Sequence, residues 1–326
     1  AYEIMPSLVG SEMCIRDSLN TGCRTDIPAY YSEWFYNRIK EGYVLARNPY
    51  YPNQVMKYSL DSRVVDCLCF CTKNPEPMLS RMEEIRQFKQ FWHVTITPYG
   101  KEVEPYVPDK ERVMEAFKRL AAIVGVNAVG WRYDPIFITD KYSLDFHVDA
   151  FRKMAENLAG YTQTCVISFI DLYAKTRRNF SGIREVPRAD QITIAREFVE
   201  IGRKYGITIR SCCEGAFLEE YGVDVSGCMT KQVLEKATGA SLDLAKIKKP
   251  AREECNCLLG NDIGMYNTCG HGCLYCYANY NRKTVEQNMR FHNPQSPLLV
   301  GELLEEDVIK EVKQVSFCSG QMTLPL

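Results

Sequence analysis

The chain has 326 residues, with 40 Lys and Arg against 41 Asp and Glu and a formal net charge of −1. Hydrophobic residues make up 46% and charged residues 25%, which excludes a wholly disordered chain and provides enough material for a core. The near-zero net charge gives no reason to expect nucleic acid or an anionic membrane as a partner. No apolar run approaches the roughly 18 residues that a membrane helix needs, so we expect no membrane span.

The first 18 residues differ in character from the rest of the chain. Residues 1–18 (AYEIMPSLVGSEMCIRDS) lack a starting Met, and SLVGSEMCIRD resembles a translated sequencing adapter. We therefore expect this segment, including Cys14, to be foreign to the native protein. No basic stretch followed by an apolar stretch indicates a secretory signal, so we expect a cytoplasmic location.

Short runs rich in β-branched and aromatic residues predict strands along the chain. They lack clean apolar–polar alternation, which is typical of parallel strands covered on both faces. Residues 43–48 and 54–59 predict a small hairpin. The expected strands of the main sheet are residues 19–26, 64–72, 91–97, 127–133, 164–171 and 206–212.

Helical patterns fill the intervals between these strands. Asp109 is expected to cap a helix with Phe117 on its apolar face, and Asp190 a helix with Phe198 on its face and Gly206 at its end. Residues 83–90 and 144–158 predict two more helices. The C-terminal tail predicts an extended segment and a short helix.

Strands that alternate with helices at intervals of about 30–40 residues predict repeated βαβ units and an α/β fold. We expect a (β/α) barrel, full or partial, and a doubly wound open sheet is the alternative. No glycine fingerprint for phosphate follows a strand, which argues against a dinucleotide site. The expected organisation is a foreign segment (1–18), a barrel (19–250), a cysteine-rich cluster segment (251–290) and a tail that packs on the barrel (291–326).

Polar residues recur where the expected strands end. Chemistry in a barrel takes place at the carboxyl ends of the strands, so these residues predict a polar pocket. Arg132 and Asp134 could bind a substrate carboxylate or phosphate, or form an ion pair that fixes a loop; Lys73 and Glu214 are the other candidates for catalysis. The strand ends carry Arg24, Thr25, Asp26, Thr72, Lys73, Thr97, Arg132, Asp134, Asp171, Cys212, Cys213 and Glu214.

Fifteen cysteines are unusual in a chain of otherwise average composition. Without an oxidising destination, clustered cysteines indicate metal ligands more than disulfides. Cys269, Cys273 and Cys276 have the spacing C-x3-C-x2-C, which lets one loop ligate three irons of a [4Fe–4S] cluster and leave the fourth open. Gly270 and Gly272 give the loop the backbone freedom that this needs.

This spacing, with Tyr275 before the last cysteine, resembles the signature of the radical S-adenosylmethionine enzymes. The resemblance implies a (β/α) barrel whose open iron binds S-adenosylmethionine, and reductive cleavage of that molecule to a 5′-deoxyadenosyl radical. The motif lies near the C-terminus instead of after the first strand, although a permuted layout would keep it on the same face. The superfamily's Gly-Gly-Glu segment has only a loose counterpart in Cys213-Glu214-Gly215.

A closer resemblance covers nearly the whole chain after Ser18. It is to an uncharacterised bacterial family known as domain of unknown function 1848, whose cysteine cluster has been likened to the radical-enzyme motif. This resemblance implies no established activity. The segments that carry it are RTDIPAYYSEWF, CTKNPEPM, TITPYG, WRYDPI, CCEG, DIGMYNTCGHGCLYCYAN and SPLLVGEL.

Zinc is the alternative to an iron–sulfur cluster. Cys269, His271, Cys273 and Cys276 would offer three thiolates and one imidazole, although His271 is expected beside the site more than in it. Alternatively, Cys255 and Cys257 could complete a four-thiolate site.

Several other cysteines leave the number of metal sites open. Cys255 and Cys257 could bind a second cluster, give the first its fourth ligand, or do neither. A second cluster would need partners from Cys212, Cys213, Cys228, Cys67, Cys69 and Cys71. The last three share one face of a strand, where small buried hydrophobic residues are the favoured interpretation.

Two more features bear on function. Tyr275 and Tyr277 could pack on an adenine or shield the cluster from water. The basic run at residues 175–188 could meet a phosphate-bearing substrate, but a solvated loop is favoured.

The leading hypothesis is a cytoplasmic iron–sulfur enzyme that uses S-adenosylmethionine, a reducing electron donor and a small-molecule or unknown substrate. A non-catalytic protein with structural zinc or a fully ligated cluster is the second hypothesis. A barrel hydrolase or lyase with a structural metal is the third.

Overall fold

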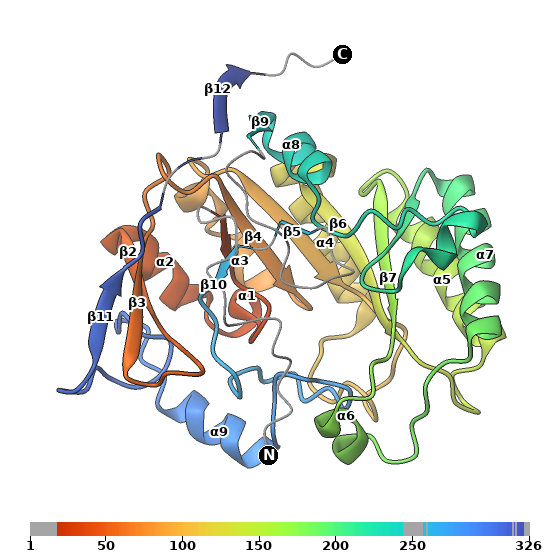
Figure 1. The fold of residues 1–326 in the computed structure, drawn as a ribbon. Helices are drawn as coiled ribbons and strands as arrows, with labels where there is room; N and C mark the ends of the chain where they lie inside the picture. Colours follow the sequence, from red (N-terminus) through yellow and green to blue (C-terminus); the bar gives the residue numbers. More distant parts are fainter. Residues whose placement is uncertain (1–17, 244–256, 259, 315, 317, 323–326) are drawn as a thin grey trace.

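The computed structural model describes residues 18–243, 257–258, 260–314, 316 and 318–322. Cys14, Cys255 and nearly all of the segment expected to be foreign lie outside the described residues. Within them, the centre of the fold is a seven-stranded sheet in the order β10-β1-β4-β5-β6-β7-β8, in which every neighbouring pair is parallel (Figure 1).

Each expected strand region overlaps one strand of this sheet. The first is much shorter than expected, because the chain turns after Asn20 and Asp26 caps the first helix. The strand β10 was not expected at all. The strands are β1 (Ser18–Asn20), β4 (Cys67–Thr72), β5 (Gln90–Thr95), β6 (Val129–Ile136), β7 (Thr164–Phe169), β8 (Thr208–Ser211) and β10 (Asn261–Asp262).

The helix expected after Asp109 forms at Lys110–Val124, with Asp109 at its N-cap position but without a side-chain capping hydrogen bond, and the helix expected at residues 144–158 is confirmed. The cap expected at Asp190 is wrong: α7 begins at Arg188 after Pro187, so Asp190 lies in its first turn. The helix expected at residues 83–90 is wrong: only a 3-10 turn forms at Met82–Ile85, because β5 begins five residues later. The α-helices are α1 (Ile27–Tyr30), α2 (Ser32–Glu41), α3 (Glu76–Leu79), α4 (Lys110–Val124), α5 (Leu144–Leu158), α6 (Ala174–Asn179), α7 (Arg188–Tyr205), α8 (Lys231–Thr238) and α9 (Arg282–Arg290); two further 3-10 helices are η3 (Val126–Ala128) and η4 (Ala216–Tyr221).

The main apolar core lies on the face of the sheet that carries the long helices. Successive side chains of a strand point to opposite faces, so Phe70 of β4, Trp92 of β5 and Trp131 of β6 all point to this face. Phe70 stacks on Trp92 with ring centroids 3.9 Å apart. Trp131 stacks on Phe151 of α5, which in turn stacks on Phe198 of α7. The stack of Trp131, Phe151 and Phe198 thus joins the sheet to α5 and α7.

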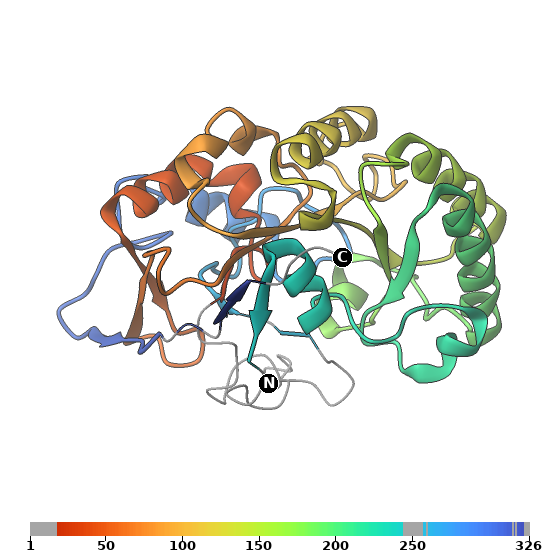
Figure 2. The ribbon, with the colours of Figure 1, turned by 90° about the horizontal axis from the view of Figure 1, so that it is seen from above.

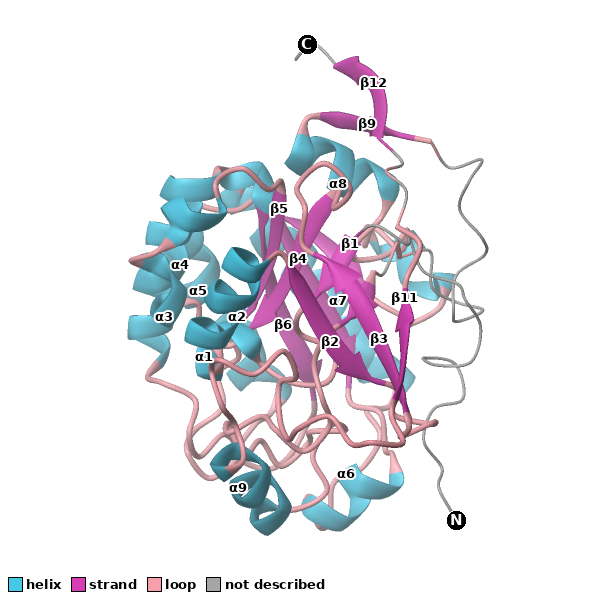
Figure 3. Ribbon diagram, turned by 90° about the vertical axis from the view of Figure 1, so that its left-hand side faces the viewer, coloured by secondary structure: helices cyan, strands magenta, loops and turns pink. Residues whose placement is uncertain are grey.

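The long helices α4, α5 and α7 lie side by side along that face of a curved sheet, whereas α8 lies on the other side (Figures 2 and 3). The α/β class is confirmed. Strand pairing in the described chain ends at β10 on one edge and at β8 on the other, so the described strands do not form the full barrel expected as one possibility.

The hairpin expected near residue 50 is confirmed as β2 (Tyr43–Arg47) and β3 (Gln54–Ser59), which pair antiparallel. The short helix expected in the tail is wrong. Residues Val308–Glu311 instead form β11, which pairs parallel with β3, and Arg47 binds Asp307 with 2.7 Å between Nη2 and Oδ2. The β-branched pair Val308 and Ile309 suits this pairing.

A separate pair, β9 (Ala240–Leu242) and β12 (Cys318–Met322), is antiparallel. No helix among the described residues is long and apolar enough to cross a membrane.

The buried His147 makes the stability of the fold depend on pH. Its Nδ1 lies 2.8 Å from the hydroxyl of Tyr133 and its Nε2 lies 2.8 Å from the carbonyl of Phe137. Burial lowers the pKa of His147 to about 4, so the unfolded chain takes up a proton at a higher pH than the folded protein. Stability from this group is therefore complete above pH 6.5 and falls as the pH drops toward 4.

We predict that His147→Gln reduces the loss of unfolding free energy between pH 7 and pH 5 by about 2 kcal/mol relative to wild type. Urea denaturation at both pH values measures this difference. An equal loss in the two proteins would show that His147 does not titrate as described.

Candidate functional site

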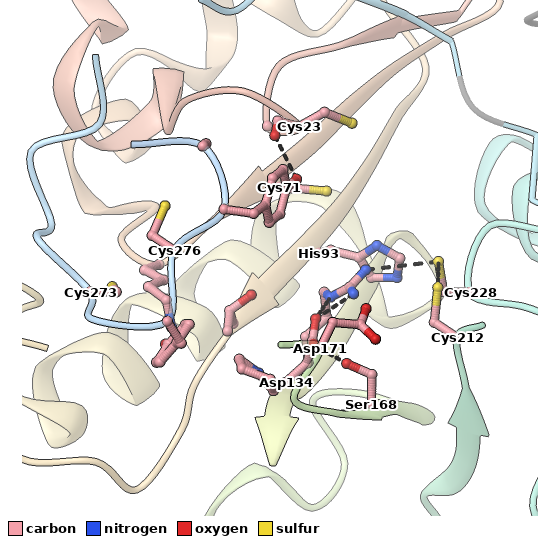
Figure 4. Close-up of a pocket in the computed structure, with 18 of the residues that line it drawn as sticks. Cys23, Cys71, His93, Asp134, Ser168, Asp171, Cys212, Cys228, Cys273 and Cys276 are labelled. Atoms are coloured by element: carbon pink, nitrogen blue, oxygen red, sulfur yellow. Dashed lines mark hydrogen bonds and ion pairs between the residues drawn. The ribbon is translucent and has the colours of Figure 1, made fainter. Parts of the chain in front are cut away.

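A cavity of about 340 Å³ opens at the carboxyl ends of the parallel strands and carries nine cysteines on its wall. It also brings together all four residues expected as catalytic candidates: Lys73, Arg132, Asp134 and Glu214. Figure 4 shows Cys273 and Cys276 on one side of it and Cys212 and Cys228 on the other. The nine cysteines are Cys23, Cys71, Cys212, Cys213, Cys228, Cys257, Cys269, Cys273 and Cys276.

The loop with the C-x3-C-x2-C spacing reaches the cavity because β10 pairs parallel with β1, in the register Leu19 with Asn261 and Asn20 with Asp262. Loops that follow two neighbouring parallel strands leave the same edge of a sheet, so this C-terminal loop emerges beside the loop after β1. Arg24 holds the start of the loop through Asp262, with 2.7 Å between Nε and Oδ2.

Both ring nitrogens of His271 make contacts that hold this loop in place. Its Nε2 lies 2.8 Å from Oδ2 of Asp26, and its Nδ1 lies 3.1 Å from the hydroxyl of Tyr30. The side chain is only 3% exposed. Because both ring nitrogens are engaged, the zinc site that uses His271 as a ligand does not match this arrangement.

Cys269, Cys273 and Cys276 all line the cavity, and each interacts electrostatically with at least one of the others. Burial raises the pKa of all three thiols, to about 12 for Cys273. The three thiols therefore stay protonated in the metal-free protein, and a bound metal would displace these protons. None of the described cysteines forms a disulfide. Three unpaired thiols of one loop that face one cavity fit a metal cluster.

The two glycines expected to free the loop do so in different ways. Gly272 has a φ of +69°, where a side chain is strained. A Cβ at Gly270 would come within 2.7 Å of the ring of Tyr30, so this position needs a residue with no side chain.

Glu104 forms a buried network under the cysteine loop. Its carboxylate is 1% exposed and accepts hydrogen bonds from Lys73 at 2.8 Å, from Thr97 at 2.7 Å, and from Lys110 and Tyr275. Burial alone would raise the pKa of Glu104, but the two lysines hold it at about 2. Lys73 and Tyr275 therefore lie in fixed positions beside the cysteines.

Arg132 and Asp134 form the ion pair that was one of their two expected roles, and they do so on the cavity wall. Nε of Arg132 lies 3.0 Å from Oδ2 of Asp134, and the hydroxyl of Ser168 donates to Oδ1 of the same carboxylate. Burial alone would lower the pKa of Arg132, but the charges of Asp134 and the neighbouring thiols raise it well above its ordinary value.

Glu214 differs from Asp134 in that its carboxyl group has a raised pKa. Its Oε1 accepts the backbone N–H of Phe169 at 2.9 Å. Burial, followed by the nearby charges of Asp171 and Asp134, raises the pKa of Glu214 to about 8. This side chain is therefore mostly protonated at neutral pH and can donate a proton into the cavity.

A second group of thiols closes the far side of the cavity. The sulfurs of Cys212 and Cys228 are 3.5 Å apart, those of Cys228 and Cys257 are 3.3 Å apart, and all three lie within 4.8 Å of one another. This triad could hold a metal ion. Cys257 thus lies with Cys228 and Cys212, whereas Cys255 lies outside the described residues.

Cys67 and Cys69 are buried in a small apolar cluster behind the cavity, where they pack with Phe91 and Val166. Of the three cysteines of that strand, Cys71 alone lines the cavity.

Among the residues that sequence reasoning missed, Cys23, His93 and Glu104 matter most for the site. Cys23 lies in the turn after β1, and its carbonyl accepts the hydroxyl of Tyr277 at 2.6 Å. His93 lies on the same inward face of β5 as Phe91. The strand was expected from the sequence, and the alternation of its side chains between the two faces could have identified His93. Glu104 lies in an irregular loop that has no sequence signal.

The basic run at residues 175–188 does more than form a solvated loop. Its first part is α6, which covers the cysteine loop. Lys175 donates to the carbonyl of Tyr277 at 3.0 Å and Arg178 to that of Tyr280 at 2.5 Å.

Replacing Glu104 tests the network that supports the loop. Glu104→Gln leaves the buried ammonium groups of Lys73 and Lys110 without their counter-charge, and we expect it to lower the unfolding free energy by about 3–5 kcal/mol. Glu102→Gln is the matched control: this carboxylate is 50% exposed and pairs with Lys141, so its loss should cost less than about 1 kcal/mol. Equal effects of the two variants in urea denaturation would contradict the network.

Comparison with known proteins gives one family and no curated relative. No curated protein matches the chain. Residues 18–278, which span β1, the main sheet and the cysteine loop through Ala278, match the family described as "Domain of unknown function (DUF1848)". Since the match covers well over half of the chain, the protein belongs to the DUF1848 family.

Proposed function

We propose that the protein is an iron–sulfur enzyme of the radical S-adenosylmethionine type, with a [4Fe–4S] cluster on Cys269, Cys273 and Cys276. The observation that carries the proposal is that these three thiols, at that spacing, come from one loop and face one cavity. Three ligands leave one iron open. When bound, the reduced cluster supplies the electron that cleaves S-adenosylmethionine to methionine and a 5′-deoxyadenosyl radical.

The order of the sheet supports a permuted form of this enzyme type. The cysteine loop follows the edge strand β10, and β1 is the next strand in the sheet. In the permuted form, β10 thus occupies the position in the sheet that the first strand of the chain has in the usual form of this enzyme type. In the proposed architecture, the curved sheet with its long helices on one face is a partial (β/α) barrel.

The chain's own residues hold the reactants and keep water out. Lys73 places a positive charge near Cys273, and its Nζ lies 5.5 Å from the centre of the Tyr275 ring. Helix α6 covers the loop from outside through Lys175 and Arg178. Such shielding protects a radical reaction from side reactions with solvent.

The opposite wall of the cavity would bind the substrate. Arg132 offers positive charge and Asp134 negative charge, and the protonated Glu214 can donate a proton. Because charged and hydrogen-bonding side chains line this wall, we infer a small polar substrate. The reaction requires a reducing electron donor, and a cytoplasmic location would keep the many thiols reduced.

Anaerobic purification and reconstitution test the cluster. We predict about four irons and four sulfides at this site, with broad visible absorbance, and release of 5′-deoxyadenosine on addition of dithionite and S-adenosylmethionine. Cys273→Ala should lose both the absorbance and the release.

Cys165→Ala is the matched control, because Cys165 is a fully buried cysteine of β7 outside the cavity wall. It should keep the cluster and the cleavage activity. Cluster formation without any 5′-deoxyadenosine would refute the radical chemistry and leave an iron–sulfur protein.

A further inference from the structure

The two edges of the main sheet are joined by an irregular segment. Residues 223–229 run beside β8, where Ser211 donates to the carbonyl of Asp224 at 3.0 Å and Asp224 donates to that of Ile209 at 2.9 Å. On the other side of the segment, Leu258 donates to the carbonyl of Met229 at 2.7 Å. The chain then enters β10. In a closed barrel β8 and β10 would pair as strands, and here a few backbone hydrogen bonds of the irregular segment connect them instead.

The second thiol triad lies at this junction and takes one residue from each part. Cys212 directly follows β8, Cys228 belongs to the irregular segment, and Cys257 precedes β10 by four residues. Their closest sulfur pairs are 3.5 and 3.3 Å apart. Four ligands arranged tetrahedrally at a zinc–sulfur distance of about 2.3 Å are about 3.8 Å from one another. The triad is therefore spaced for a single ion, whereas a cubane cluster would need its sulfurs farther apart.

Hydrogen-bond donors surround the sulfurs in the way that metal thiolates require. The backbone N–H groups of Cys228 and Met229 point at the sulfur of Cys257, at 3.2 and 3.4 Å. Nη1 of Arg132 lies 3.8 Å from the sulfur of Cys228. Such donors stabilise negative charge on a ligand and fix its orientation.

His93 is an independent observation that points to a ligand. The side chain is 1% exposed, yet neither ring nitrogen has a hydrogen-bond partner within the described part of the chain. Its ring packs against Gly130, where a Cβ would come within 2.9 Å of Cδ2, and it interacts electrostatically with Cys212. Figure 4 shows His93 on the side of the cavity that carries Cys212 and Cys228, but neither ring nitrogen lies within 4.8 Å of all three sulfurs of the triad, so ligation requires the ring to shift toward them. A buried imidazole without partners is costly, and coordination to a metal would satisfy it.

We propose that Cys212, Cys228, Cys257 and His93 bind one Zn²⁺ ion that clamps the β8 edge of the sheet to the segment entering β10. Three thiolates and one imidazole are a common tetrahedral set for structural zinc. The three thiols release three protons on binding, and no electron is transferred. Because β10 leads into the cysteine loop, the clamp fixes the position of that loop relative to the substrate side of the cavity.

Metal analysis of the protein expressed with both iron and zinc in the medium tests this site. We expect about one zinc per chain in the wild type and also in the triple variant Cys269→Ala/Cys273→Ala/Cys276→Ala, which removes the proposed cluster. Cys228→Ala should lose the zinc, and Cys165→Ala should keep it. Failure of the cluster proposal alone would leave the zinc result unchanged.

Zinc-edge X-ray absorption of the wild type keeps the proposal testable even if Cys228→Ala does not fold. The expected spectrum has three sulfurs at about 2.3 Å and one nitrogen at about 2.0 Å. Four sulfurs and no nitrogen would refute His93 as the ligand. Iron in place of zinc in the triple variant, or an intact mass lower by the two hydrogens of a disulfide between Cys228 and Cys257, would overturn the clamp.

Discussion

The two-residue period of the parallel strands is the constraint on which the rest of the structure depends. In β4 it sends Leu68 and Phe70 toward the helices and Cys69 and Cys71 toward the opposite side. Neighbouring strands in register repeat the pattern, so one face becomes a continuous aromatic core. The other face collects thiols, an imidazole and an ion pair. A one-residue slip of any central strand would exchange the two faces and destroy the core and the cavity together.

The pairing of β10 with β1 joins segments that are about 240 residues apart in the sequence. It is a pairing of only two residues on each strand, and side chains provide much of its support. The Arg24–Asp262 ion pair, the contact of His271 with Asp26, and the hydrogen bond from Tyr31 to the carbonyl of Thr268 all connect the start of the chain to the cysteine loop. Both thiol groups thereby face one cavity, and a substrate held there would lie between them.

How much could be predicted from the sequence depended on whether the signal was local. The C-x3-C-x2-C loop and the long helices each have a pattern within one short stretch of sequence, so the sequence alone is enough to assign them. By contrast, Cys212, Cys228, Cys257 and His93 come from four separate segments, and only the folded sheet brings them together. Val308 and Ile309 lie in a run rich in Glu and Lys, which favours a helix locally, but pairing with β3 makes it a strand.

Two metal sites on opposite walls of one cavity are the central claim of this account. Anomalous diffraction from crystals of the anaerobically purified protein, recorded at the iron and zinc absorption edges, tests it most directly. The account predicts iron density against Cys269, Cys273 and Cys276 and a single zinc peak against Cys212, Cys228 and Cys257. Absence of iron from the first group, or of any metal from the second, would contradict it.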